Sequence, residues 1–257
     1  GGTRVANVGL SNEGPMVGEF EEVGEEHLGV RHGVAVANAT QGLGIVAKAL
    51  GLHGEVVVPA FTFVATAHSL AWQGLTPVFC DIDRESHQLD PAAVEAVITE
   101  RTTGILAAHT WGRPCDIDSL TELAARHHLQ LFFDAAPAYG ASYRGTHIGN
   151  FGRAEVLSFH ATKVVNSGEG GAILTNDDEI AATARLMRTF GFADTDLATS
   201  IGTNAKLCLL YTSDAADDPP CVDHGGRRII KQKKTHTTHT TPQSHISIHR
   251  DHSKLHL

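Results

Sequence analysis

Short apolar runs alternate with helix-like segments over the first two hundred residues of the chain. Each run is short enough for a buried strand, and each intervening segment repeats its apolar positions at helical spacing. This alternation predicts an α/β fold with a mostly parallel sheet covered by helices on both faces. The expected strands cover residues 34–37, 55–59, 76–81, 104–109, 129–133, 155–158 and 172–175, and the expected helices cover residues 19–28, 43–50, 64–73, 91–98 and 116–128.

Polar and aromatic side chains gather where the expected strands end. Thr40, Phe63, His109, Asp134 and Ser158 lie at or just beyond these ends. Because ligands on open parallel sheets bind outside the carboxyl ends of the strands, we expect these residues to share one site.

The segment Asn38-Ala39-Thr40-Gln41-Gly42 joins the first expected strand to a helix. A helix N-terminus presents free backbone N–H groups and a positive dipole end, which suits a phosphate, and the Thr40 hydroxyl could add a donor. The same residues also suit a plain helix cap formed by Thr40 or Asn38. The local sequence does not decide between these two interpretations.

Lys163 and Asp134 are the candidates for covalent and acid–base chemistry. Before residue 200 the only lysines are Lys48, within a helical pattern, and Lys163, just past the strand 155–158. Lys163 fits either an ordinary loop lysine or a Schiff-base lysine. Asp134 follows an apolar run, so it fits either a helix cap or a buried counter-ion for a protonated pyridine nitrogen.

Two aromatic residues follow the strand 55–59. Phe61 and Phe63 lie at the turn into the next helix. They could stack on a flat ring or simply anchor that helix.

Composition restricts the classes of partner. The formal net charge of −9 argues against nucleic acid, since phosphate binding needs a basic face. No apolar run approaches the roughly 18 residues of a membrane span. The four cysteines include no CxxC pair, so we expect neither a disulfide framework nor a zinc site, and no metal. A cytoplasmic protein with no membrane partner is the expectation.

The composition changes after Leu207. From Cys208 onward the chain has seven of its 17 histidines, and the apolar periodicity stops. A disordered, metal-binding tail is one interpretation. The preferred one is a non-native segment, because residues 208–217 resemble a translated sequencing adapter and those that follow resemble its read-through. The predicted division is therefore a large domain over residues 1–207 and a tail without function over residues 208–257.

The body of the chain resembles the DegT/StrS-type sugar aminotransferases, which are pyridoxal-phosphate enzymes of fold type I. The resemblance covers roughly residues 12–207 and depends on an ordered set of motifs. These are Gly14-Pro15-Met16-Val17, Asn38-Ala39-Thr40, the run from Val58 to Phe63, the run from Pro77 to Asp83, Gly112-Arg113-Pro114-Cys115-Asp116-Ile117-Asp118, Asp134-Ala135-Ala136 and Ser158-Phe159-His160-Ala161-Thr162-Lys163.

The resemblance implies a role for each matching residue around the cofactor ring. Lys163 would bond covalently to the cofactor and then shuttle a proton to and from the substrate carbon. Asp134 would pair with the pyridinium nitrogen. Phe63 would stack on the ring, with Phe61 as the second choice.

The resemblance also implies the phosphate contacts and the assembly. Ser158 and Thr40, with the backbone at Ala39 and Gln41, would hold the phosphate. Asn204 matches an asparagine that reaches the phosphate of the neighbouring subunit in a dimer. The implied reaction moves an amino group from glutamate to a keto group on a nucleotide-linked sugar.

The chain departs from the family pattern in two places, which concern a cofactor contact and the domain content. Pro137 stands where the family often has glutamine or histidine, and proline cannot hydrogen-bond the ring hydroxyl of the cofactor. The chain also leaves the family pattern after Leu207, so we expect a large domain without its small C-terminal domain. The alternatives are a fragment that at most binds pyridoxal phosphate, or another fold-type-I reaction such as an aldolase or a cysteine desulfurase.

Overall fold

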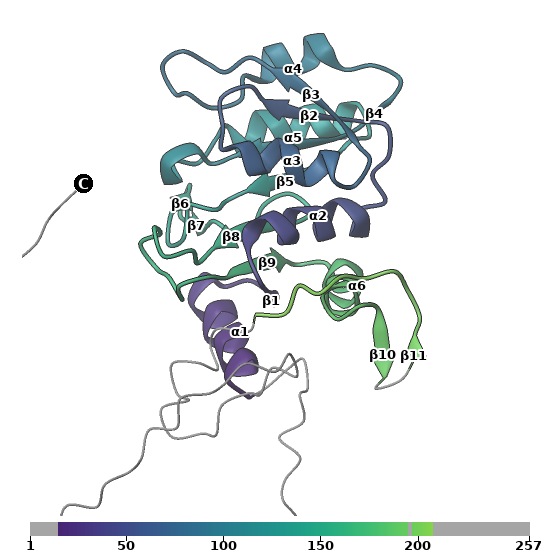
Figure 1. Ribbon diagram of the computed structural model, residues 1–257. Coiled ribbons are helices and arrows are strands. Elements are labelled where there is room, and N and C mark those ends of the chain that lie inside the picture. The colour runs from purple at the N-terminus through teal and green to yellow at the C-terminus, as the bar shows by residue number, and fades with distance from the viewer. Residues whose placement is uncertain (1–14, 195–196, 208–257) are drawn as a thin grey trace, which may run out of the picture. The chain divides into compact units, whose positions relative to one another are not determined.

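The computed structural model describes residues 15–194 and 197–207 (Figure 1). The central sheet contains β1 (His32–Val36), β2 (Glu55–Pro59), β3 (Thr76–Cys80), β4 (Thr102–Ala108), β5 (Gln130–Asp134), β8 (Glu155–Ser158) and β9 (Gly171–Thr175). The helices are α1 (Pro15–Leu28), α2 (Ala39–Ala49), α3 (Val64–Ala71), α4 (Pro91–Val97), α5 (Ile117–Arg126) and α6 (Asp178–Arg188), with a 3-10 turn at Thr110–Gly112. Two small hairpins pair β6 (Ser142–Tyr143) with β7 (Thr146–His147) and β10 (Phe192–Asp194) with β11 (Leu197–Ala198).

The strand order in the sheet is β1-β9-β8-β5-β4-β2-β3. The pairs from β8 through β5, β4 and β2 to β3 are parallel, whereas β9 runs antiparallel to both β1 and β8. The prediction of a mostly parallel sheet is therefore confirmed. The carboxyl ends of β1, β2, β4, β5 and β8 meet at one edge of the sheet, and this is the edge that the sequence pattern selected for a site.

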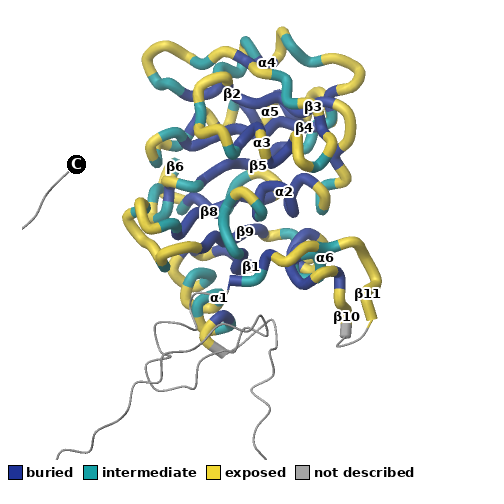
Figure 2. The backbone as a smooth tube through the Cα atoms, viewed as in Figure 1, coloured by how far each residue is buried: buried dark blue, intermediate teal, exposed yellow. Residues whose placement is uncertain are grey.

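Helices cover both faces of the sheet, as predicted, and each face has its own apolar core. Successive strand residues point to opposite faces, so Phe132 packs with α2, α3 and α6, whereas Phe133 packs with α4 and α5. Apart from the edge strand β3, the strands between these layers are largely buried in Figure 2, and Phe132 and Phe133 are both fully buried. This two-sided burial explains why the strands are continuous apolar runs.

Side-chain caps set where several helices begin. Asp90 accepts from Ala92 N–H at 2.9 Å ahead of Pro91 at the first turn of α4, and Asp116 accepts from Ser119 N–H at 3.2 Å before α5. Proline at the first turn of a helix removes an N–H that would otherwise lack a partner. The expected helix bounds at residues 91–98 and 116–128 are therefore close to those observed.

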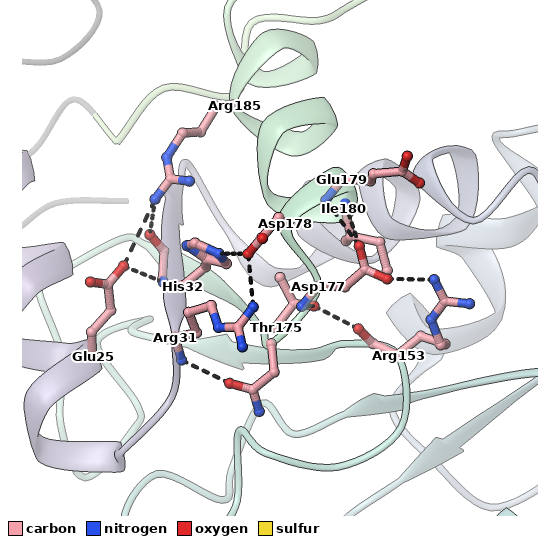
Figure 3. A network of polar contacts seen from close by, with 12 residues as sticks. Glu25, Arg31, His32, Arg153, Thr175, Asp177, Asp178, Glu179, Ile180 and Arg185 are labelled. Atoms are coloured by element: carbon pink, nitrogen blue, oxygen red, sulfur yellow. Dashed lines mark hydrogen bonds and ion pairs between the residues drawn. The ribbon is translucent and has the colours of Figure 1, made fainter.

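Helix α6 begins in a charged network that joins it to β1 and to the loop before β8 (Figure 3). Asp177 accepts from Glu179 N–H at 2.9 Å and Ile180 N–H at 3.2 Å, and its other oxygen accepts from Arg153 at 2.6 Å. One oxygen of Asp178 contacts His32 Nε2 at 2.7 Å and accepts from Arg31 at 3.1 Å. The network fixes α6 against the antiparallel end of the sheet.

Three features lie beyond the sequence prediction. Helix α6 and the two hairpins were not expected, and α2 begins at Ala39, four residues before the predicted residue 43. None of the helices in the described ranges is long and apolar enough to span a membrane. The predicted tail, residues 208–257, lies outside the described residues.

Candidate active site

A cavity of about 790 Å³ opens at the carboxyl ends of β1, β2, β4, β5 and β8. It receives residues from the start of α2, the turn into α3, the turn after β4, the turn after β5 and the loop after β8. Six of the eight predicted site residues line it, namely Ala39, Thr40, Phe63, Asp134, Ser158 and Lys163. The residues expected at the strand ends, including His109, thus line one common cavity.

Asn38 caps helix α2 at one wall of this cavity. Its side-chain oxygen accepts from Gln41 N–H at 2.9 Å, so that amide already has a partner. Ala39 and Thr40 belong to the first turn of the helix, where N–H groups have no partner inside the helix. These two amides are better placed than that of Gln41 to receive an anion, and Gln41 is not among the residues that line the cavity.

Asp134 is the buried carboxylate of the site, with 6% of the residue exposed. One oxygen accepts from the Thr66 hydroxyl at 2.7 Å and the other from Ala136 N–H at 3.1 Å. Burial raises the pKa of Asp134 above its ordinary value, and these two hydrogen bonds, together with the charges of His109 and Lys163, oppose part of that rise. Asp134 thus caps a turn, because residues 135–141 form turns and not a helix.

The surroundings of Asp134 favour a cationic ligand. Thr66 and the Ala136 amide are neutral donors, and no ion pair to Asp134 forms among the residues of the described ranges. A buried carboxylate without a paired charge is costly, and a protonated ring nitrogen in the cavity would supply that charge. The Asp134 carboxylate, held by two neutral donors, therefore fits the protonated ring nitrogen of pyridoxal 5′-phosphate.

Lys163 is positioned by a compact loop between β8 and β9. Its N–H donates to His160 O at 2.8 Å, and Ala161 N–H donates to Gly168 O at 2.8 Å. Its side chain is half-buried and lines the same cavity as Asp134. Ser158, at the end of β8, is buried, and its hydroxyl accepts from His160 N–H at 3.3 Å.

Phe63 provides an exposed aromatic surface inside the cavity. It precedes the first residue of α3 and is 76% exposed, although hydrophobic side chains are normally covered. Phe61 also lines the cavity and is 45% exposed. An exposed ring in the cavity that Asp134 also lines suits stacking on a flat heterocycle better than it suits a helix anchor.

Two polar pairs next to the cavity were not recognised in the sequence. His109 Nδ1 accepts from Cys115 N–H at 3.2 Å, so its protonated Nε2 donates to Glu155 at 3.0 Å. Both side chains are fully buried. The signal for this pair was a glutamate at the start of the otherwise apolar strand 155–158.

The second pair lies beside Lys163. His160 Nε2 is 3.4 Å from Glu169, both residues line the cavity, and His160 Nδ1 is 2.9 Å from the Thr162 hydroxyl. In the sequence, the only sign of this pair was that His160 lies within the motif that contains Lys163 and that Glu169 lies in the glycine-rich segment that follows it.

Asn204, like Gln41, is a predicted site residue that does not line the cavity. It is exposed and forms an isolated antiparallel bridge with Thr189 beyond α6. Its predicted role concerns a neighbouring subunit, so its position within one chain does not test that role.

Comparisons with known proteins agree with this geometry. The DegT/DnrJ/EryC1/StrS aminotransferase family matches residues 3–211. GDP-perosamine synthase of Caulobacter vibrioides is 42% identical over 184 residues, which are 71% of this chain and 50% of that protein. The dTDP-4-amino-4,6-dideoxy-D-glucose transaminase of Shigella dysenteriae is 39% identical over 201 residues, which are 78% of this chain and 55% of that protein.

The solved structures give the same result. DesI, crystallised in the presence of its TDP-sugar product, is 49% identical, with a TM-score of 0.74 over 80% of this chain and 54% of that one. The chain thus spans about half the length of the relatives that it matches. The architecture is that of the large domain of fold-type-I pyridoxal-phosphate enzymes. This chain belongs to the DegT/DnrJ/EryC1/StrS aminotransferase family.

Proposed function

We propose that this chain carries the cofactor site of an aminotransferase that moves an amino group to a keto group on a nucleotide-linked sugar. The observation that carries the proposal is the cavity shared by Lys163, the buried Asp134 and the N-terminus of α2. The names of the two curated relatives both contain a nucleotide-linked amino sugar, which supports this class of substrate.

Pyridoxal 5′-phosphate is the cofactor of this family, and the cavity residues fit it. The amides of Ala39 and Thr40, with the hydroxyls of Thr40 and Ser158, would hold the phosphate. Asp134 would hold the ring nitrogen in its protonated form, and Phe63 would cover one face of the ring. When bound, the group supplies an electron sink for the carbon that loses its proton.

Lys163 performs the proton chemistry in this proposal. Its amine is the covalent anchor and then the base that holds and returns a proton within the cavity. Asp134 keeps the neighbouring charge fixed during that exchange. Pro137, where many relatives have a hydrogen-bonding side chain, lines the cavity without offering a donor.

The remaining parts of the proposal concern the whole protein. Glutamate would be the amino donor, and a homodimer would bring Asn204 of one subunit to the phosphate of the other. Residues 1–207 would form the large domain, and a nucleotide-linked substrate would place the reaction in the cytoplasm.

A spectroscopic titration tests the core of the proposal. Pyridoxal 5′-phosphate added to the purified chain should produce an absorbance band at the edge of the visible range. Lys163→Ala should abolish the band, because the covalent anchor is gone, and Lys48→Ala should keep it. The loss of the band in Lys48→Ala as well would contradict the assignment.

Glutamate then tests the direction of the chemistry. It should convert the bound cofactor to its amine form and remove the band. A folded chain without any band would support a fragment that does not assemble the site. A band that responds to another amino acid and not to glutamate would support a different fold-type-I reaction.

A further inference from the structure

Three aromatic side chains meet at the rim of the cofactor cavity. We call Phe61, His87 and Trp111 the aromatic corner. The ring centroids of Phe61 and Trp111 are 5.6 Å apart at 73°, and those of His87 and Trp111 are 5.3 Å apart at 66°. The rings therefore contact edge to face, which leaves flat ring surface uncovered.

The aromatic corner is held in an unfavourable backbone conformation. Trp111 and His87 both have a φ of 57°, in the left-handed region that bulky residues rarely adopt. At the neighbouring Gly112 a side chain would meet Pro137 O at 2.7 Å, so the turn is packed closely against the loop after Asp134. Strain of this kind persists only where the surrounding structure imposes it, and it gathers at ligand clamps.

The corner is also exposed where it lines the cavity. Trp111 is 70% exposed and Phe61 is 45% exposed, and both line the cavity that contains Lys163. Neither ring is needed to fill an apolar core, since neither belongs to the buried clusters. The exposed ring surface of Phe61 and Trp111 is therefore available to a ligand in the cavity.

We propose that the aromatic corner binds the nucleobase of a nucleoside diphosphate, the part of the substrate that extends away from Lys163. This inference rests on the proposed nucleotide-sugar substrate. Stacking suits any base, because every base has a π-face. A base offers two flat faces without hydroxyl groups, whereas a pyranose carries hydroxyl groups around its ring that need polar partners nearby.

The charges near the corner agree with this ligand. Arg84 and Arg113 flank it in the sequence, and both side chains are exposed. Neither forms an ion pair with another residue of the described ranges. The polar pair His160 and Glu169 lies in the part of the cavity next to Lys163, where the sugar hydroxyls would find partners.

Tryptophan fluorescence provides a direct test, because the chain has only two tryptophans, Trp72 and Trp111. Trp72 follows the last residue of α3, is 85% exposed and does not line the cavity, so Trp72→Phe makes Trp111 the sole reporter. In this variant a nucleoside diphosphate such as dTDP or GDP should quench the emission saturably. The matched control, Trp111→Phe, leaves Trp72 as the reporter and should show no quenching.

The affinity series completes the test. Trp111→Leu should weaken binding of the nucleoside diphosphate about tenfold, as measured by calorimetry, because stacking surface is lost. Trp111→Phe should weaken it less, because a ring remains. Circular dichroism should show the same secondary structure for each variant.

Three outcomes would overturn the inference. They are equal quenching by inorganic pyrophosphate, equal quenching by a free hexose, and Trp111 emission that changes with protein concentration but not with nucleotide. The last result would make the corner a contact between copies of the chain. A normal Lys163 band without nucleotide quenching would reject this inference alone, whereas quenching without the band would reject the proposed cofactor chemistry alone.

Discussion

The cofactor cavity and the α6 network both gather charged side chains, but they treat charge in opposite ways. In the α6 network Asp177 and Asp178, the two carboxylates at the start of the helix, both have cationic partners. Asp178 contacts His32 and Arg31, and hydrogen bonds from these two side chains hold its pKa below the ordinary value. Asp177 contacts Arg153, and hydrogen bonds from Ile180 N–H and from Arg153 hold its pKa below the ordinary value. In the cavity, burial raises the pKa of Asp134, whose hydrogen bonds come from neutral groups.

This difference separates structure from chemistry. Charges satisfied within the chain leave nothing for a ligand, and at exposed positions such as Asp178 they add little to the stability of the fold. A buried charge that the chain leaves without its counter-ion lowers the stability of the empty protein and becomes favourable when a cation binds. The contrast predicts that substitutions in the two regions have opposite effects on function and on stability.

The largest expected effect is on function, at Asp134. Asp134→Asn keeps the size of the side chain and removes the charge that would pair with the ring nitrogen. We expect the rate of cofactor conversion by glutamate to fall about 10²–10³-fold, the usual loss when one preorganised electrostatic partner is removed. Single-turnover absorbance measures this rate. The unfolding midpoint in urea should stay equal or rise, and a clear fall in that midpoint would show that the carboxylate is structural.

The next effect is on stability, at the buried end of α6. Arg188 is 1% exposed, donates to Ala35 O at 2.8 Å and forms an ion pair with Glu21. Glu21→Ala removes one partner of a buried pair, and we expect a loss of about 3 kcal/mol in the free energy of unfolding. Urea denaturation measures it. The control is Glu22→Ala, because Glu22 lies next to Glu21 on α1 but is exposed. An equal loss of stability in this control would refute the role of the Glu21–Arg188 pair.

The sequence predicted the cavity more completely than the α6 region. The runs at residues 55–59 and 155–158 gave strand bounds that match those of the structure, because both runs are buried on two sides. Asp134, Ser158 and Lys163 were selected as candidates because each lies at the end of an apolar run or just beyond it. Helix α6 was missed because its buried positions, such as Ala181 and Ala184, are small and lie among charges.

Other details depend on tertiary pairing, which the local sequence does not encode. The direction of β9 follows from its pairing with β1 and β8, not from its composition. The amide of Gln41 fits a phosphate or the Asn38 cap equally well on residue type, and only the folded turn shows the cap. The His109–Glu155 pair joins residues 46 positions apart, so a buried glutamate was the single local sign of it.

A smaller effect is expected where α6 begins. Asp177→Ala removes the acceptor for Glu179 N–H and Ile180 N–H and the partner of Arg153. Loss of a helix cap costs about 1 kcal/mol, so the thermal midpoint should fall by a few degrees. Asp177→Asn should recover most of the loss, since asparagine is also a good cap. Failure of asparagine to restore the midpoint would assign the effect to the Arg153 ion pair.

The smallest effect is a difference in pH dependence between the two regions. The pKa of Asp178 is lowered in the folded chain, so its contribution is present above the unfolded pKa of about 3.9 and is lost as pH falls through the folded value. The pKa of Asp134 is raised, so its folded form binds protons more tightly and stability falls as pH rises above about 3.9. Without cofactor, Asp134→Asn should therefore gain stability over the parent chain as pH rises through this window, whereas Asp178→Asn should lose it.

Urea midpoints across the acidic range measure the stability of each variant against pH. Parallel curves for the two variants would mean that both carboxylates are equally satisfied within the chain, and the distinction between the regions would then fail.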